Sequence, residues 1–206
     1  MIVKPEELEN NKKIFVDTLK ETGRSGIDNV LVNLEELGFF TAPASTRFHG
    51  AEEGGLLQHS INVWQEAWCI RTVQMKIRPD LAELVPESSV AIAALLHDVC
   101  KAEIYVKEKK FRKNEQGRWE DYIGYGVDYS SFPMGHGEKS VVQLLRWGLK
   151  MTDAEMLAIR WHMGAFNIPF QSSEMGTCLT KAKERHPLVS IISSADELAS
   201  YILESR

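Results

Sequence analysis

The chain has 206 residues, of which 44% are hydrophobic and 26% charged, a composition that excludes disordered, collagen-like and fibrous proteins and predicts one domain. Its net charge of −5 excludes a global positive field that would attract nucleic acid or an anionic membrane, so any affinity for phosphate must be local. Because no apolar segment resembles a membrane span or a signal peptide, and because the three cysteines are far apart, we expect a cytoplasmic protein with reduced thiols.

The first half of the chain predicts four helices, because apolar residues recur there at intervals of three and four. Residues 39–55 interrupt this pattern with Pro43 and three glycines, and we expect an exposed loop there. The helices are expected at Pro5–Thr22, Ile27–Leu37, Leu56–Ile77 and Ser88–Asp98.

The second half changes character at residues 104–129, which are rich in Tyr, Val, Phe and Trp on both sides of a turn-like segment at 114–117. Such a segment favours a small β-hairpin. Helical periodicity then returns, with helices expected at Gly137–Leu149, Asp153–His162 and Pro187–Glu204. The predicted fold class is all-α, a helical bundle with a small β-hairpin insertion around residues 104–129.

Polar groups that can bind metal interrupt the apolar faces of several predicted helices. Asp196 lies on a helical row with Val189 and Ile192, and burying an unpaired carboxylate costs several kcal/mol, so a cation should face it. His59 points inward from a row that includes Leu56 and Val63. Taken alone, a histidine in that position is more typical of a hydrogen-bonded core residue than of a ligand.

These polar residues are expected to meet, because independent core histidines would not be distributed over so many buried helix faces. A shared metal ion would supply the positive charge that both carboxylates need. Mixed imidazole and carboxylate ligands favour Mn, Fe, Co, Ni or Zn, while Mg remains compatible and one or two ions are expected. The candidate ligands are His59, His97, Asp98, His136, His162 and Asp196.

The order of these six residues resembles the HD superfamily of metal-dependent phosphohydrolases. The resemblance covers about residues 45–200 and is carried by the strings GGLLQHSINVW around His59, AALLHDVCK around the His-Asp doublet, GHGEKS around His136 and SADELA around Asp196. The segment GGLLQH is also similar to the HD domain of bacterial 3′ to 5′ exoribonucleases.

The resemblance implies a helical metal-binding core at residues 45–204, on which helices of residues 1–44 pack, in a single domain spanning 1–206. Family members hold one metal ion with a set of four residues, which here is His59, His97, Asp98 and Asp196. His136 and His162 match two further histidines that hold a second ion in some members, with the doublet aspartate as a bridge. We therefore expect a binuclear centre.

Such a centre implies hydrolysis of a phosphomonoester or phosphodiester by metal-activated hydroxide, because the metal lowers the pKa of bound water toward about 7. Asp98 would fix the metal spacing, and Lys101, one turn further on, could stabilise a phosphate oxygen. Cys100 stands where the family string HDxGK has glycine, so a side chain is expected to narrow the site. Arg47 and His49 are weaker candidates for substrate contacts, since loop residues of these types are more often solvent-exposed.

The predicted hairpin carries the one basic run of the sequence, KEKKFRK at Lys107–Lys113. Such a run is usually a solvated surface, but it could also attract a polyanionic substrate. The aromatic residues Trp119, Tyr122 and Tyr125 in the same hairpin could stack on a base.

The expected substrate is a small phosphate ester, most simply a nucleotide, and a short single-stranded nucleic acid is compatible. No membrane partner is expected, and the sequence leaves the oligomeric state open. Two other functions stay open: an HD-type di-iron oxygenase, and a non-catalytic, metal-stabilised nucleotide-binding module. The cyclic-di-GMP phosphodiesterase signature HHExxDGxGYP is absent, since residues 135–140 read GHGEKS.

Overall fold

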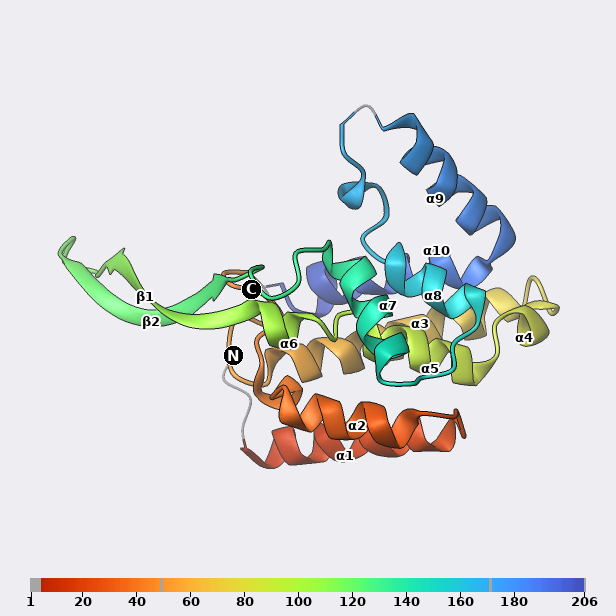
Figure 1. The fold of residues 1–206 in the computed structure, drawn as a ribbon, viewed down its shortest axis with the longest axis horizontal. Helices are drawn as coiled ribbons and strands as arrows, with labels where there is room; N and C mark the ends of the chain where they lie inside the picture. Colours follow the sequence, from red (N-terminus) through yellow and green to blue (C-terminus); the bar gives the residue numbers. More distant parts are fainter. Residues whose placement is uncertain (1–4, 49, 171, 206) are drawn as a thin grey trace.

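The computed structural model describes residues 5–48, 50–170 and 172–205, most of which are helical (Figure 1). None of the helices within these ranges is long and apolar enough to cross a bilayer. Two 3-10 turns, Phe39–Thr41 and Gly164–Asn167, and a π-helical turn, Ala199–Leu203, accompany the α-helices. The α-helices are α1 (Pro5–Glu21), α2 (Ile27–Glu36), α3 (Gly55–Met75), α4 (Leu81–Leu84), α5 (Glu87–Leu96), α6 (Lys101–Ile104), α7 (His136–Arg146), α8 (Asp153–Arg160), α9 (Ser173–Arg185) and α10 (Pro187–Leu198).

The core is built around α5, in which every residue of Ser89–Leu96 is buried. A helix that is apolar on all sides must be covered on all sides. Accordingly, α3 and α8 flank α5, α1 covers it, and α10 packs against both α3 and α8. The helices α3, α5, α8 and α10 therefore form the central bundle that carries the site described below.

The N-terminal helices form an outer layer on this bundle (Figure 1). Phe15 of α1 and Leu34 of α2 are fully buried and belong to the same apolar cluster as Leu56 of α3. A polar contact reinforces the layer, because the Arg24 guanidinium donates to both carboxylate oxygens of buried Glu155, at 2.9 and 2.7 Å. Two charge-assisted hydrogen bonds to a buried acid are the arrangement that makes such a pair stabilising.

The predicted hairpin is present and projects from the helices as an arm (Figure 1). Strands β1 (Tyr105–Lys113) and β2 (Trp119–Val127) pair antiparallel, from Tyr105 opposite Val127 to Lys113 opposite Trp119. The turn falls where the sequence predicts it, and the Asn114 side-chain oxygen stabilises it by accepting hydrogen bonds from the backbone N–H groups of Gln116 and Arg118, both at 3.0 Å.

The largest difference from the sequence prediction is α9, which the periodicity argument missed. Its first turns contain Gly176 and Thr177, which are weak helix formers, and only Leu179 and Ala182 are buried. The helix contacts chiefly α10 and the 3-10 turn at Gly164–Asn167. A helix with so small a buried face leaves little apolar periodicity to detect.

Other differences concern element ends, short turns and the segment 39–55, which was expected to be exposed but buries Phe39, Phe40 and Ala44 in the core. The expected loop at 39–55 contains the 3-10 turn Phe39–Thr41, and the short helices α4 and α6 were not predicted. Helix α5 ends at Leu96, so the His-Asp doublet lies in the turn after the helix rather than within it.

Candidate metal centre

The six candidate ligands come together although they arise from five separate parts of the fold. The doublet follows α5, and each of the other four residues comes from a different helix or helix end. Five of the six are buried, and the His136 side chain is 20% exposed. Their origins are α3 for His59, the turn after α5 for His97 and Asp98, the first residue of α7 for His136, the turn after α8 for His162 and α10 for Asp196.

Two glycines allow the backbones that carry these residues to approach closely. A side chain at Gly55 would collide with the backbone of Gly50. Glycine at this position therefore lets the preceding loop pack against the start of α3, one turn before His59. A side chain at Gly137 would likewise collide with the carbonyl oxygen of Arg160, where the start of α7 meets the end of α8. The second contact brings the segments of His136 and His162 together.

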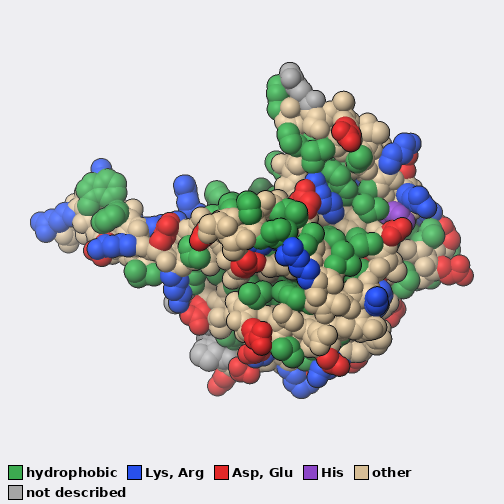
Figure 2. Space-filling model, in the orientation of Figure 1, with side chains coloured by type: hydrophobic (Ala, Val, Ile, Leu, Met, Phe, Trp, Pro, Cys, Tyr) green, Lys and Arg blue, Asp and Glu red, His purple; other side chains and the backbone are tan. Residues whose placement is uncertain are grey.

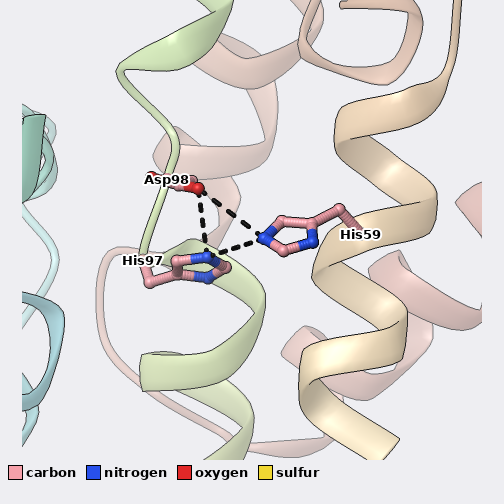
Figure 3. Close-up of side chains that lie close together, drawn as sticks. All are labelled: His59, His97 and Asp98. Atoms are coloured by element: carbon pink, nitrogen blue, oxygen red, sulfur yellow. Dashed lines mark hydrogen bonds and ion pairs between the residues drawn. The ribbon is translucent and has the colours of Figure 1, made fainter. Parts of the chain in front are cut away.

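His59, His97 and Asp98 form one compact group (Figure 3). The Nε2 atom of His97 lies 3.3 Å from Nε2 of His59 and 3.1 Å from Oδ2 of Asp98. The same Nε2 atom of His59 lies 3.2 Å from Oδ1 of Asp196. Two imidazoles and two carboxylates therefore point at a common volume.

Asp98 also faces a second group. Its Oδ1 atom lies 3.4 Å from Nε2 of His162 and 3.9 Å from Nε2 of His136, and the two imidazole Nε2 atoms are 3.2 Å apart. The ligand atoms of Asp98, His136 and His162 all lie within 4.8 Å of one another, as do those of His59, His97 and Asp98. One carboxylate thus stands between two potential ligand groups.

Hydrogen bonds at the outer ring nitrogens fix how the imidazoles face this volume. Nδ1 of His97 lies 2.8 Å from the carbonyl oxygen of Ala94, and Nδ1 of His162 lies 2.7 Å from that of Ile159. A carbonyl only accepts, so Nδ1 carries the hydrogen in both rings and Nε2 of each neutral ring presents a lone pair. This is how metal-binding histidines are usually oriented.

The donor set fits a divalent transition metal. Facing Nε2 lone pairs and carboxylate oxygens repel unless a proton or a cation lies between them, and Asp98 Oδ1 is buried without a hydrogen-bond partner among the described residues. Imidazole with carboxylate is the ligand mixture that suits Mn, Fe, Co, Ni or Zn.

Burial and neighbouring charges together set the protonation state of the cluster. Burial opposes ionisation of both Asp98 and Asp196, but in each case the neighbouring groups outweigh it. Lys101 and the nearby imidazoles lower the pKa of Asp98. The hydrogen bond from His59 lowers the pKa of Asp196. For His59, burial is also outweighed, and its contacts with Asp196 and Glu204 raise its pKa to about 9. Burial dominates at His136 and lowers its pKa to about 4. The acids are therefore held as anions.

An open cavity of about 450 Å³ adjoins the cluster. His136, His162 and Asp196 form part of its wall, so the cluster is reachable from outside, and a volume in this range suits a small organic ligand. Lys101 also lines the cavity, and its Nζ atom lies 2.5 Å from Oδ2 of Asp98. The sequence-predicted pair of Asp98 and Lys101 is therefore in direct contact.

The predictions for Arg47, His49 and Cys100 have different outcomes. Arg47 is exposed, lies with its guanidinium 5.7 Å from the Phe48 ring centroid and is not among the described residues that line the cavity, so its substrate contact stays a prediction. His49 lies outside the described residues. The expectation that Cys100 narrows the site is wrong, because its buried thiol turns toward α7 and donates to the carbonyl oxygen of His136 at 3.2 Å. Burial raises the pKa of this thiol to about 12.

Glu204 is a site residue that the sequence argument missed. Its carboxylate accepts a hydrogen bond from Nδ1 of His59 at 3.0 Å and from the Asn62 amide at 2.9 Å. A carboxylate on the outer nitrogen of an imidazole fixes the ring and makes its inner nitrogen a stronger ligand. The only available signal was the general rule that metal-binding histidines have such a partner.

Comparison with known proteins gives one informative likeness. The chain is 29% identical over 131 residues to dihydroneopterin 2′,3′-cyclic phosphate phosphodiesterase from Methanocaldococcus jannaschii. The matched region is 62% of this chain but 45% of that protein, so the chain spans less than half the length of its relative. No family model matches the chain, and no solved structure matches it either.

Proposed function

We propose that this protein is a metal-dependent phosphodiester hydrolase of the HD superfamily that acts on a nucleotide or a short oligonucleotide. The observation that carries the proposal is the convergence of four imidazole Nε2 atoms and two carboxylates on one buried volume that opens into a cavity. The likeness to a phosphodiesterase over 131 residues supports it independently of this geometry.

The proposed ligand set follows from the two groups that share Asp98. One ion would be held by the first four-residue set, and a second by Asp98 with the two remaining histidines. A bound divalent ion would supply water with a lowered pKa and would stabilise negative charge on phosphoryl oxygens. The first set is His59, His97, Asp98 and Asp196, and the second is Asp98, His136 and His162.

The other residues of the cavity would bind and orient the substrate. Lys101 presents an ammonium group at the cavity wall, where it would neutralise a phosphate oxygen. Its contact with Asp98 holds that ammonium in place before the substrate arrives. Glu204 would keep the His59 ring in its orientation and thus act as a positioning residue.

The remaining cavity wall supports a substrate with a planar ring. Tyr105, Tyr129, Phe166 and Tyr201 contribute aromatic surface to the same cavity as Lys101. An aromatic wall and a cation match a compound that joins a heteroaromatic ring to a phosphate. The relative's name describes such a compound, a pterin with a cyclic phosphodiester.

The test is hydrolysis by the purified full chain supplied separately with Mn²⁺, Fe²⁺, Co²⁺, Ni²⁺, Zn²⁺ or Mg²⁺. We expect release of p-nitrophenol from bis-p-nitrophenyl phosphate and opening of nucleoside 2′,3′-cyclic phosphates with at least one of these ions. His97→Ala should abolish both reactions. His186→Ala is the matched control, because His186 lies outside the cluster, and this variant should remain active.

Two results would contradict the proposal. One is the absence of hydrolysis with every ion and substrate, and the other is equal activity of the two histidine variants. Iron bound together with substrate-dependent oxygen uptake would identify the oxygenase instead. Tight metal with nucleotide binding but no product would identify the non-catalytic module.

A further inference from the structure

The two faces of the β-hairpin arm differ in a way that the proposed centre does not explain. Side chains alternate between the faces of a strand, and directly paired residues share a face. One face, here called the lysine–aromatic face, carries Lys107, Lys109, Phe111 and Lys113 of β1 with Trp119 and Tyr125 of β2. Figure 2 shows basic and hydrophobic side chains together along this arm.

The charges on the opposite face neutralise one another. Arg112 pairs with Glu120 at 2.7 Å and lies over the Tyr122 ring, while Lys110 pairs with Glu108 at 3.4 Å. Two basic and two acidic side chains therefore cancel on that face.

The lysine–aromatic face is not balanced in this way. Its one acidic residue, Asp121, pairs with Lys109 at 3.0 Å. Lys107 and Lys113 form no ion pair with any residue in the described part of the chain, and Lys113 lies 5.6 Å from the ring centroid of Trp119. This face thus combines the ammonium groups of Lys107 and Lys113, unpaired within the described ranges, with the Trp119 ring, which is 68% exposed. The excess of positive charge on this face contrasts with the net charge of −5 of the whole chain.

The face also leads to the proposed metal centre. Tyr105, the first residue of β1, is on the same face of the strand as Lys107. It also lines the cavity, together with Lys101, His136 and His162. The nine residues of β1 extend about 26 Å from that point, since eight steps of about 3.3 Å separate its two ends. A linear ligand on the arm would therefore have one end at the cavity.

We infer that the lysine–aromatic face binds single-stranded nucleic acid and that the substrate of the centre is a phosphodiester of such a strand. Lysines spaced along the strand would neutralise successive phosphates, and Phe111 and Trp119 would stack on unpaired bases. Charge complementarity selects this occupant over the same face of a second copy, since two such faces would bring unpaired lysines together. The inference rests on the proposed function, because it names the substrate class of the same site.

The test measures binding of a fluorescein-labelled, phosphorothioate-linked single-stranded dodecamer to the full chain by fluorescence anisotropy. Trp119→Ala should raise the dissociation constant at least about fivefold, since stacking of one base contributes about 1–3 kcal/mol. The strand register places Tyr122 on the opposite face, so the sequence-based expectation that it stacks on the same ligand as Trp119 and Tyr125 is not supported. Tyr122→Ala is therefore the matched control and should leave the constant within about twofold of the unaltered protein.

The lysines are tested by the salt dependence of the same binding. Lys113→Ala should reduce the slope of log affinity against log salt by about 0.7, the value for one neutralised phosphate of a single strand. Arg112→Ala removes the same charge from the opposite face of the same strand and should change the slope less. A duplex of the same sequence should bind more weakly, because its bases are already stacked.

Equal binding by each variant and its control, or equal affinity for duplex and single strand, would overturn the inference. So would a dimer in analytical ultracentrifugation that Trp119→Ala dissociates, because the face would then bind a second copy. Hydrolysis of bis-p-nitrophenyl phosphate by the unaltered protein is measured in parallel. Hydrolysis without oligonucleotide binding rejects this inference alone. Binding without hydrolysis rejects the proposed function, and with it the substrate named here, but leaves the lysine–aromatic face as a binding site.

Discussion

Replacing Asp98 by asparagine is expected to lower kcat/KM for bis-p-nitrophenyl phosphate by at least about a thousandfold, since a bound metal contributes several kcal/mol and each 1.36 kcal/mol is tenfold in rate. Asp98 faces both ligand groups, so the substitution removes the charge on which both would depend. Asparagine has nearly the same shape, and the buried volume stays filled. Metal content should fall together with activity, as measured by elemental analysis of the purified variant.

The control for this prediction is Asp17→Asn, which removes a carboxylate from the exposed face of α1. Its activity and metal content should equal those of the unaltered protein. Circular dichroism should show that both variants keep their helices. A folded Asp98→Asn protein that retains its metal and its activity would remove Asp98 from the proposed centre.

Replacing Lys101 by alanine is expected to lower kcat about a hundredfold to a thousandfold, which is the usual cost of removing one group that stabilises transition-state charge. Burial opposes the charge of Lys101, but its contact with Asp98 outweighs burial and raises its pKa, so the ammonium is charged at neutral pH. Steady-state kinetics should show the loss mainly in kcat, because the proposed contact strengthens as charge develops on the phosphate.

Lys101→Arg should recover part of this loss, since it keeps the charge at a changed geometry. Lys181→Ala, which removes an exposed lysine of α9, should leave kcat unchanged. The metal content of Lys101→Ala should match that of the unaltered protein. A parallel loss of metal and activity would show instead that Lys101 only holds Asp98 in place.

The parts of the fold that the sequence predicted well are those with a strong buried pattern. The apolar run of α5 and the inward row of α3 place His97 and His59 on buried surfaces, as the periodicity argument expected. The hairpin was recognisable from its aromatic and β-branched residues and from the turn at Asn114. Helix α9 was missed because its stability depends on contacts with α10 rather than on its own pattern.

Glu204 shows why part of the site could not be predicted. A continuous α-helix would place Leu203 on the buried row of Asp196 and Ala199, but Leu203 is 48% exposed. The π-helical turn, in which the N–H of Glu204 donates to the carbonyl oxygen of Ala199, changes the direction of the side chains that follow. Glu204 thereby reaches His59, and no periodicity argument contains that shift.

Elemental analysis of the purified full chain tests the central claim most directly, because the claim is that the convergent imidazoles and carboxylates bind metal. The account predicts one or two equivalents of a divalent transition metal per chain, and none in Asp98→Asn. Unaltered protein that is free of metal, and that takes up none when Mn²⁺, Fe²⁺, Co²⁺, Ni²⁺ or Zn²⁺ is added, would contradict it.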